Sequence, residues 1–170
     1  MEITEEKRKA MADYLAGPLN RFMSAAEKGD IKTMKAALGE VASVDVHEPW
    51  YGRTALHCAA HSGSIEAIEF LVAAGAALNA LDGNEMTPLM CACSTGRTKG
   101  SKAALLLLHH GADALYVREN DGMNAIKFAL WGRCTQPVLK ELLARGATPP
   151  EAEFKMVHLV GQASRVSAIR

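Results

Sequence analysis

The 170-residue sequence is long enough to form one domain with a substantial core. Hydrophobic residues make up 49% and charged residues 22%, a composition that indicates a globular protein and excludes a disordered or membrane-spanning chain. The Lys+Arg and Asp+Glu counts are both 19, so we expect neither nucleic acid nor a membrane surface as a partner. Aromatic residues are only 5%, which favours closely packed helix pairs over a β-sandwich.

The first predicted element is a helix from Thr4 to Gly17. Thr4 can accept a hydrogen bond from the first turn, Glu5 and Glu6 face the positive helix end, and a Gly-Pro pair ends the helix. No apolar run follows the charged start of the sequence, so no secretory signal or spanning segment is predicted. The expected compartment is the cytoplasm, although a leader removed upstream would leave no trace.

The stretch from Gly52 to Ala60 has a partial copy at Thr87 to Cys93. Thr54 and Thr87, 33 positions apart, can each cap a helix, and Pro88 suits the first helical turn because its missing N–H costs no hydrogen bond there. Each copy is followed by a glycine, a run with helical spacing and a Gly-Ala stop. The repeated unit is therefore helix, turn, helix, loop.

Less regular copies of this unit lie on both sides. Upstream, the pair Ala25-Ala26 and Gly29 stand 34 positions before their counterparts in the first full copy, but the opening Thr-Pro is absent. Downstream, Asn124 stands in place of the threonine and Lys127 in place of the histidine. The spacing predicts four units in all.

A period near 33 residues with Thr-x-Leu-His-x-Ala at the first helix resembles the ankyrin repeat. The resemblance is strongest between Tyr51 and Asp82, where family positions recur in order at Thr54, Leu56, His57, Ala59, Ala60, Gly63, Gly75, Ala76 and Asn79. It implies an all-α ankyrin-repeat solenoid of about four helix-turn-helix repeats with N- and C-terminal capping helices. The implied inner helices lie near Leu19 to Lys28, Thr54 to His61, Thr87 to Ser94 and Asn124 to Gly132.

We expect a single ankyrin-repeat domain over residues 1–170. Its expected parts are an N-terminal helix (1–18), a degenerate repeat (19–51), a repeat (52–82), a repeat with an insertion (83–120), a repeat (121–150) and a C-terminal capping helix (151–170). The N-terminal helix either caps the solenoid with a polar outer face or binds a partner through its uneven apolar stripe.

The insertion runs from Gly96 to Lys102, between the two helices of its repeat. Insertions in repeat arrays map to loops, so a solvated, mobile loop is predicted. The insertion lacks the spacing of a phosphate-binding loop and no strand precedes it, which argues against a nucleotide.

The four cysteines are expected to be buried, reduced thiols that act as small hydrophobes. Cys58 and Cys91 occupy equivalent positions, and Cys91-x-Cys93 lacks the spacing of zinc ligands, so we expect no metal and no cofactor. The resemblance implies that the ring of His57 ties the Thr54 cap to neighbouring backbone. No Asp or Glu is placed beside a Cys-His pair, so we expect no enzyme activity.

Two bulky aromatic residues, Trp50 and Tyr51, fall at an expected loop tip in a chain with few aromatics. Trp and Tyr are the residue types that carry binding energy at interfaces. Either they contact a partner, or Trp50 folds back over a gap in the degenerate first repeat.

The resemblance implies that a protein partner of unstated identity binds the concave face, with this chain acting as an adaptor or as an inhibitor or immunity factor, and we expect a monomer. The family's contact positions on loop tips fall on Trp50, Tyr51, Arg53, Asn84, Glu85, Met86, Asn120 and Met123. Those on the inner helices fall on Lys28, His61, Ser62, Ser94, Thr95, Trp131 and Arg133. Such a mixture of polar and apolar side chains is typical of an interface.

The alternative function is a structural or assembly subunit that self-associates through its ends. Its sign would be apolar side chains on the outer faces of the terminal helices, such as Met11, Tyr14, Phe154 and Val157.

Overall fold

The structure is a computed structural model that describes residues 4–149. Within this range the chain forms helices and loops, with a single isolated bridge between Val117 and Asn124. The helices are α1 (Glu5–Ala16), α2 (Pro18–Lys28), α3 (Ile31–Leu38), α4 (Ala55–Ser62), α5 (Ile65–Ala73), α6 (Pro88–Thr95), α7 (Arg97–His109), α8 (Ala125–Trp131) and α9 (Gln136–Ala144). The all-α prediction is confirmed.

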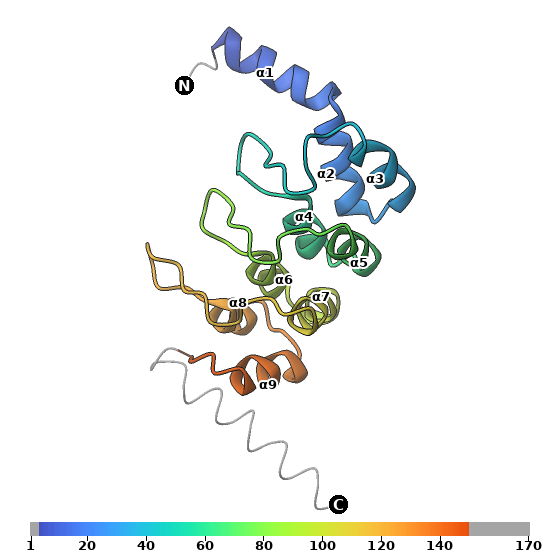
Figure 1. Cartoon of the computed structure of the whole chain (residues 1–170). Coiled ribbons are helices and arrows are strands. Elements are labelled where there is room, and N and C mark those ends of the chain that lie inside the picture. Colours follow the sequence, from blue (N-terminus) through green and yellow to red (C-terminus); the bar gives the residue numbers. More distant parts are fainter. Residues whose placement is uncertain (1–3, 150–170) are drawn as a thin grey trace, which may run out of the picture.

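The helices from α2 to α9 form four antiparallel pairs that stack along a gentle arc (Figure 1). The helices α2, α4, α6 and α8 form one row, and α3, α5, α7 and α9 form a second row beside it (Figure 1). Each inner helix packs against the inner helix of the next pair. The predicted solenoid and its inner helices are thus confirmed, while the predicted C-terminal capping helix (151–170) lies outside the described residues.

Side-chain caps start several of these helices. Thr87 Oγ1 accepts a hydrogen bond from the backbone N–H of Met90 (3.2 Å), and Asn124 Oδ1 accepts one from Lys127 (3.1 Å). Such bonds satisfy backbone donors that have no partner within the helix. Thr4 precedes α1 as predicted, but its exposed side chain makes no capping bond, so that part of the prediction is wrong.

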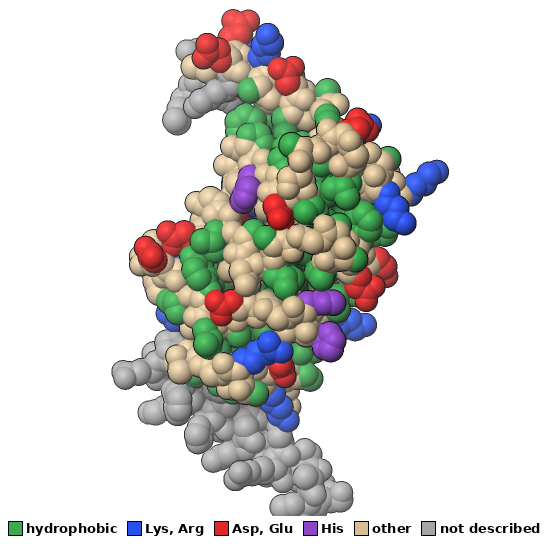
Figure 2. Space-filling view, in the orientation of Figure 1, with side chains coloured by type: hydrophobic (Ala, Val, Ile, Leu, Met, Phe, Trp, Pro, Cys, Tyr) green, Lys and Arg blue, Asp and Glu red, His purple; other side chains and the backbone are tan. Residues whose placement is uncertain are grey.

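The core lies between the two rows of helices. Alanine pairs fill the contact between inner helices, and Ala26, Ala59, Ala60, Ala92 and Ala129 are completely buried. Their short side chains let the helices approach closely, while leucine, isoleucine and methionine fill the space behind them. Figure 2 shows hydrophobic side chains reaching one face of the molecule in separate patches. No helix in residues 4–149 has the length and apolar character needed to span a membrane.

The insertion does not form the solvated loop that we expected. It lengthens the outer helix α7 to 13 residues, and Gly100 and Ser101 within it are buried. Gly96 alone connects α6 to α7, because its positive φ of 59° turns the chain back within one residue. The backbone N–H of Arg97 then donates to the carbonyl oxygen of Gly132 (3.2 Å), which joins this turn to the next repeat. Packing against α6 and the next repeat therefore orders these residues.

Near the tip of each of the three long loops, one residue lies in the left-handed region: Gly52 (φ 63°), Glu85 (φ 57°) and Gly122 (φ 65°). A side chain with a Cβ is strained there, so Glu85→Gly should raise the free energy of unfolding by about 1 kcal/mol. Urea denaturation of both proteins measures the change. Glu85→Ala is the control, since it removes the carboxylate and keeps the strain; an equal gain in both variants would contradict this explanation.

The helix α1 projects beyond the stacked pairs and packs against α2 (Figure 1). Met11 and Leu15 on α1 are exposed, and Tyr14 between them is half-buried. The apolar stripe predicted for this segment is therefore largely open to solvent.

Candidate partner-binding groove

The loops that join successive repeats project beyond the row of inner helices (Figure 1). We call the surface between these loop tips and the inner helices α2, α4, α6 and α8 the groove. Each loop is closed by a backbone N–H···O bond: Glu48 to Arg53 (2.9 Å), Asp82 to Met86 (3.0 Å) and Arg118 to Met123 (2.8 Å). These bonds hold the tips at matching positions along the solenoid.

Most of the residues predicted to contact a partner have accessible side chains. Those that are exposed are Lys28, Trp50, Tyr51, His61, Asn84, Thr95, Asn120, Trp131 and Arg133, and those that are half-buried are Arg53, Ser62, Glu85, Met86 and Ser94. Met123 is the exception, because it is only 8% exposed. Its apolar side chain belongs to the core cluster, where burial is favourable, so its prediction as a surface contact is corrected.

Glu48 shapes the loop tip that carries Trp50 and Tyr51. Its buried carboxylate accepts hydrogen bonds from the backbone N–H groups of Trp50 (3.1 Å) and Tyr51 (2.7 Å). The tip so formed leaves Trp50 39% exposed and Tyr51 59% exposed, and neither belongs to the core cluster. The alternative in which Trp50 plugs the first repeat does not describe this arrangement.

Arg53 lies beside this tip and interacts with both of its neighbours. Its guanidinium is 5.2 Å from the centre of the Tyr51 ring, and its Nε is 3.7 Å from Oε1 of Glu48. A cation over an aromatic face and a carboxylate nearby both restrain the side chain. Arg53 therefore connects the exposed Tyr51 ring to the buried Glu48 carboxylate.

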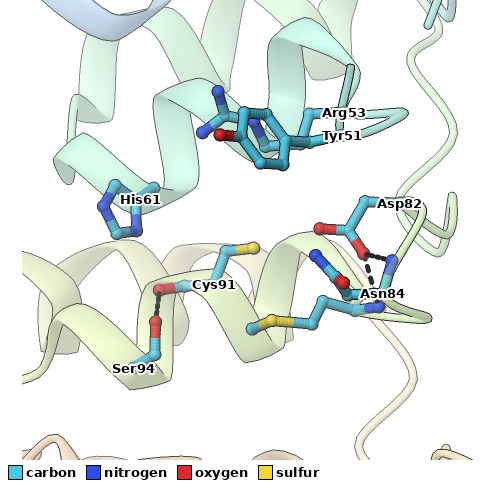
Figure 3. A pocket seen from close by; sticks show the side chains of 8 residues that line it. Tyr51, Arg53, His61, Asp82, Asn84, Cys91 and Ser94 are labelled. Carbon is cyan, nitrogen blue, oxygen red and sulfur yellow. Dashed lines mark hydrogen bonds between the residues drawn. The ribbon is translucent and has the colours of Figure 1, made fainter. Parts of the chain in front are cut away.

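A pocket of about 220 Å³ lies between the second and third repeats (Figure 3). It is lined by Tyr51, Arg53, His61, Asp82, Asn84, Met86, Cys91 and Ser94. Six of these residues were predicted as contacts, while Asp82 and Cys91 were not. The position of Asp82 directly before the loop tip was a signal that it could line the groove. Cys91 is a buried residue on an inner helix, and its sequence position gives no such signal.

Asp82 positions the lower wall of this pocket. Its Oδ1 accepts hydrogen bonds from the backbone N–H groups of Asn84 (2.8 Å) and Met86 (2.9 Å), and the residue is 9% exposed. These bonds fix the turn that carries Asn84 and Glu85.

Trp131 is the most exposed aromatic side chain of the groove. It ends α8, is 68% exposed, and meets the ring of Phe128 edge-on with 6.4 Å between centres. In the neighbouring repeats, Thr95 Oγ1 donates to the carbonyl oxygen of His61 (2.7 Å). This hydrogen bond connects the second and third repeats at the floor of the groove. Trp131 is exposed to solvent at one end of the groove.

His57 is buried and joins two repeats. Its Nδ1 accepts a hydrogen bond from the backbone N–H of Thr54 (3.1 Å) and lies 2.8 Å from Thr54 Oγ1. Its Nε2 lies 2.9 Å from the carbonyl oxygen of Met86. Because the Met86 oxygen can only accept, Nε2 carries a proton, and because Nδ1 accepts from the Thr54 N–H, Nδ1 carries none and the ring is neutral. The structural role that the resemblance implied matches this geometry.

The fourth repeat makes a similar connection with different residues. Asn124, in place of the threonine, caps α8 with its Oδ1, and its Nδ2 donates to the carbonyl oxygen of Thr148 (3.2 Å). The Asn124 amide therefore both caps its helix and bonds to a later backbone carbonyl, two roles that Thr54 and His57 divide between them in the second repeat.

Burial lowers the pKa of His57 from its ordinary value, since the charged ring would be poorly solvated. The unfolded chain takes up a proton at His57 near pH 6.5 while the folded chain does not, so the stabilisation is complete above that pH and is lost below it. Between pH 7 and pH 5 the melting temperature should fall more for the wild type than for His57→Gln. The exposed His110→Gln is the control and should retain the full decline; equal declines in all three proteins would contradict the assignment.

All four cysteines are buried and unpaired, as predicted. Burial raises the pKa of Cys58 to about 11 and that of Cys91 to about 12. Both thiols are protonated near neutral pH and are poor nucleophiles.

The stacked helix pairs and loops define a helical repeat solenoid, the class of scaffold whose accessible inner face carries binding surfaces. The family model described as ankyrin repeats (3 copies) matches residues 22–116. The chain belongs to the ankyrin-repeat family, whose fold is a non-enzymatic protein–protein interaction scaffold.

Three relatives illustrate the likeness. The chain is 36% identical to mouse (Mus musculus) RelA-associated inhibitor over 121 residues, which is 71% of this chain and 14% of that protein. It is 34% identical over 129 residues to human (Homo sapiens) transient receptor potential cation channel subfamily A member 1, covering 74% of this chain and 11% of that one. It is 37% identical over 102 residues to zebrafish (Danio rerio) ankyrin repeat and SOCS box protein 11, covering 60% and 32%. The chain therefore spans only a small part of each relative's length.

Proposed function

We propose that this chain binds a protein partner in the groove, as an adaptor or as an inhibitor of that partner. The observation that carries the proposal is the exposure of Trp131 at one end of the groove and of Trp50 and Tyr51 at another. Trp and Tyr in such positions supply a large contact area with few rotatable bonds to order. A partner that reaches both ends would cover surface from the second to the fourth repeat.

The relatives support a binding role without naming the partner. One of them is called an inhibitor, which is compatible with a chain that masks a surface of another protein. The others are a channel and a SOCS box protein, so the shared repeats occur in proteins of different kinds.

The proposal is tested by using the purified chain to capture proteins from a lysate of its source cells, followed by mass spectrometry. A protein held by the wild type and lost by Trp131→Ala, with Leu143→Ala as a matched control outside the groove, supports the proposal. A protein held equally by all three would bind elsewhere.

A second candidate function is self-association through the end of the solenoid that carries α1. The specific observation that favours it is the exposure of Met11 and Leu15 on this helix. Light scattering at rising protein concentration tests it, because a Leu15→Lys variant should then remain monomeric while the wild type grows in mass. The other predicted residues for this function, Phe154 and Val157, lie outside the described residues.

We further propose that residues 1–170 act as one domain and that the chain works as a monomer in the cytoplasm, without nucleic acid or a membrane as partner. The equal numbers of acidic and basic residues and the reduced cysteines support this setting.

A further inference from the structure

The pocket between the second and third repeats contains one carboxylate oxygen without a protein partner. Asp82 uses Oδ1 for both of its backbone hydrogen bonds, and Oδ2 accepts none within residues 4–149. In Figure 3 this second oxygen points into the pocket, on the same side as the Asn84 amide. Asp82 is only 9% exposed, so water solvates this free oxygen poorly.

The charges around the pocket leave it negative. Arg53 lines the upper wall, but Glu48 lies 3.7 Å from its Nε and compensates its charge. The carboxylate of Asp82 has no such cation beside it among the lining residues. A cationic group that entered the pocket would gain a charge-assisted hydrogen bond to a largely buried carboxylate.

The remaining lining suits a long side chain with an apolar stem. The Tyr51 ring and the Met86 thioether provide apolar surface, and Asn84 and Ser94 provide polar groups. Lysine and arginine bury their methylene stems along such surfaces while their charged ends remain hydrogen-bonded. The volume of about 220 Å³ leaves room for one side chain of this length.

We infer that this pocket receives a lysine or arginine side chain of the protein partner. Its cationic end binds Oδ2 of Asp82, and its stem packs between Tyr51 and Met86. The inference rests on the proposed function, since it specifies one contact that the partner makes in the groove. It also makes Asp82 a specificity-determining residue, because an acidic side chain would be repelled there.

The test uses blocked single amino acids as probes, so that the partner need not be known. N-acetyl-arginine amide and N-acetyl-lysine amide are titrated into the ¹⁵N-labelled chain, with the leucine and glutamate analogues as controls. Saturable shifts are expected at the amide resonances of Asn84 and Met86, whose N–H groups bond to Asp82. A single side chain should bind in the millimolar range.

The matched variants are Asp82→Asn and Asp121→Asn. The first keeps an oxygen for the two backbone bonds and removes the charge, and it should weaken binding of the basic probes about tenfold or more. Asp121 holds the next loop in a similar way, through Met123 N–H (3.0 Å), so its variant should bind as the wild type does.

The outcomes separate this inference from the proposed function. Equal shifts with the leucine probe, shifts with glutamate alone, no shifts at Asn84 and Met86, or unchanged binding by Asp82→Asn each overturn the inference. The proposed function still stands in those cases if capture of a protein depends on Trp131. Conversely, binding of arginine with capture indifferent to Trp131 supports the pocket and refutes the groove-spanning contact.

Discussion

Trp50→Ala and Trp131→Ala are each expected to weaken binding of the captured partner by about 2 kcal/mol or more, roughly a thirtyfold rise in Kd. Both side chains are large and exposed, and they lie at separated positions of the groove. A partner that spans the groove should therefore depend on both. Calorimetric titration of each purified variant with the captured partner measures the loss.

Measuring the free energy of unfolding of these variants shows whether weaker binding comes from a lost contact or from a destabilised fold. Trp131 is 68% exposed, so its truncation should change the free energy of unfolding by less than about 0.5 kcal/mol. A tryptophan that plugged the first repeat would instead cost about 3–5 kcal/mol when truncated. Large melting losses for Trp50→Ala, or undiminished affinity for either variant, would refute the groove assignment. Leu143→Ala, an exposed apolar residue on an outer helix, should leave both properties unchanged.

The second large effect is expected at His57. Replacing it with alanine should lower the free energy of unfolding by roughly 3 kcal/mol, because the Thr54 N–H and the Met86 carbonyl lose their shared partner in the core. The cavity left by the ring adds to this cost. Chemical denaturation of the wild type and the variant gives the difference directly.

Partner binding provides the check on this explanation. The folded fraction of His57→Ala should bind the partner as the wild type does, since the ring is completely buried. Lost affinity with unchanged melting would instead make His57 a contact residue. The matched control is Asn124→Asp, which keeps an oxygen for the cap but loses the donor to Thr148, and it should cost less than His57→Ala.

The sequence was sufficient for the solenoid because repeated residues mark recurring backbone geometry. Thr54 and Thr87 each begin an inner helix, and the pairs Ala25-Ala26 and Ala59-Ala60 are buried at equivalent positions. Gly29 and Gly63, 34 positions apart, both end their helices in the left-handed conformation. The structural role of His57 followed from the resemblance for the same reason. Where a copy departed from the pattern, as at Asn124, the sequence showed the change but not the hydrogen bond that compensates for it.

The insertion shows why local reasoning was insufficient elsewhere. Gly96 to Lys102 is polar and glycine-rich, which is typical of a loop, yet most of it is helical in the structure. The backbone of Gly100 lies against the carbonyl oxygen of Ala92, and Ser101 Oγ accepts from Thr135 N–H (2.9 Å). The first contact joins two helices of one repeat, and the second joins two repeats at a separation of 34 positions, so the composition of the insertion alone shows neither.

The position of the groove was predicted from the sequence, but the roles of Met123 and Asp82 were not. Family positions indicated a mixed surface, and the described side chains at most of those positions are accessible. Met123 was misplaced because an apolar residue at a loop can turn either inward or outward, and tertiary packing decides which. Asp82 was overlooked because its sequence position indicates only that it stabilises a turn. That both backbone N–H groups bond to Oδ1, which leaves Oδ2 free, depends on the side-chain rotamer and is visible only in the structure.

The central claim is that one protein partner contacts both ends of the groove, and site-specific photo-crosslinking tests it most directly. A benzoyl-phenylalanine in place of Tyr51 or Trp131 exchanges one aromatic for another, and the same residue at the exposed Glu69 of α5 or Lys102 of α7 probes the outer row. We expect the same partner to be crosslinked from Tyr51 and from Trp131 and from neither outer position. Crosslinks from Glu69 or Lys102 alone, with none from the groove, would contradict the account.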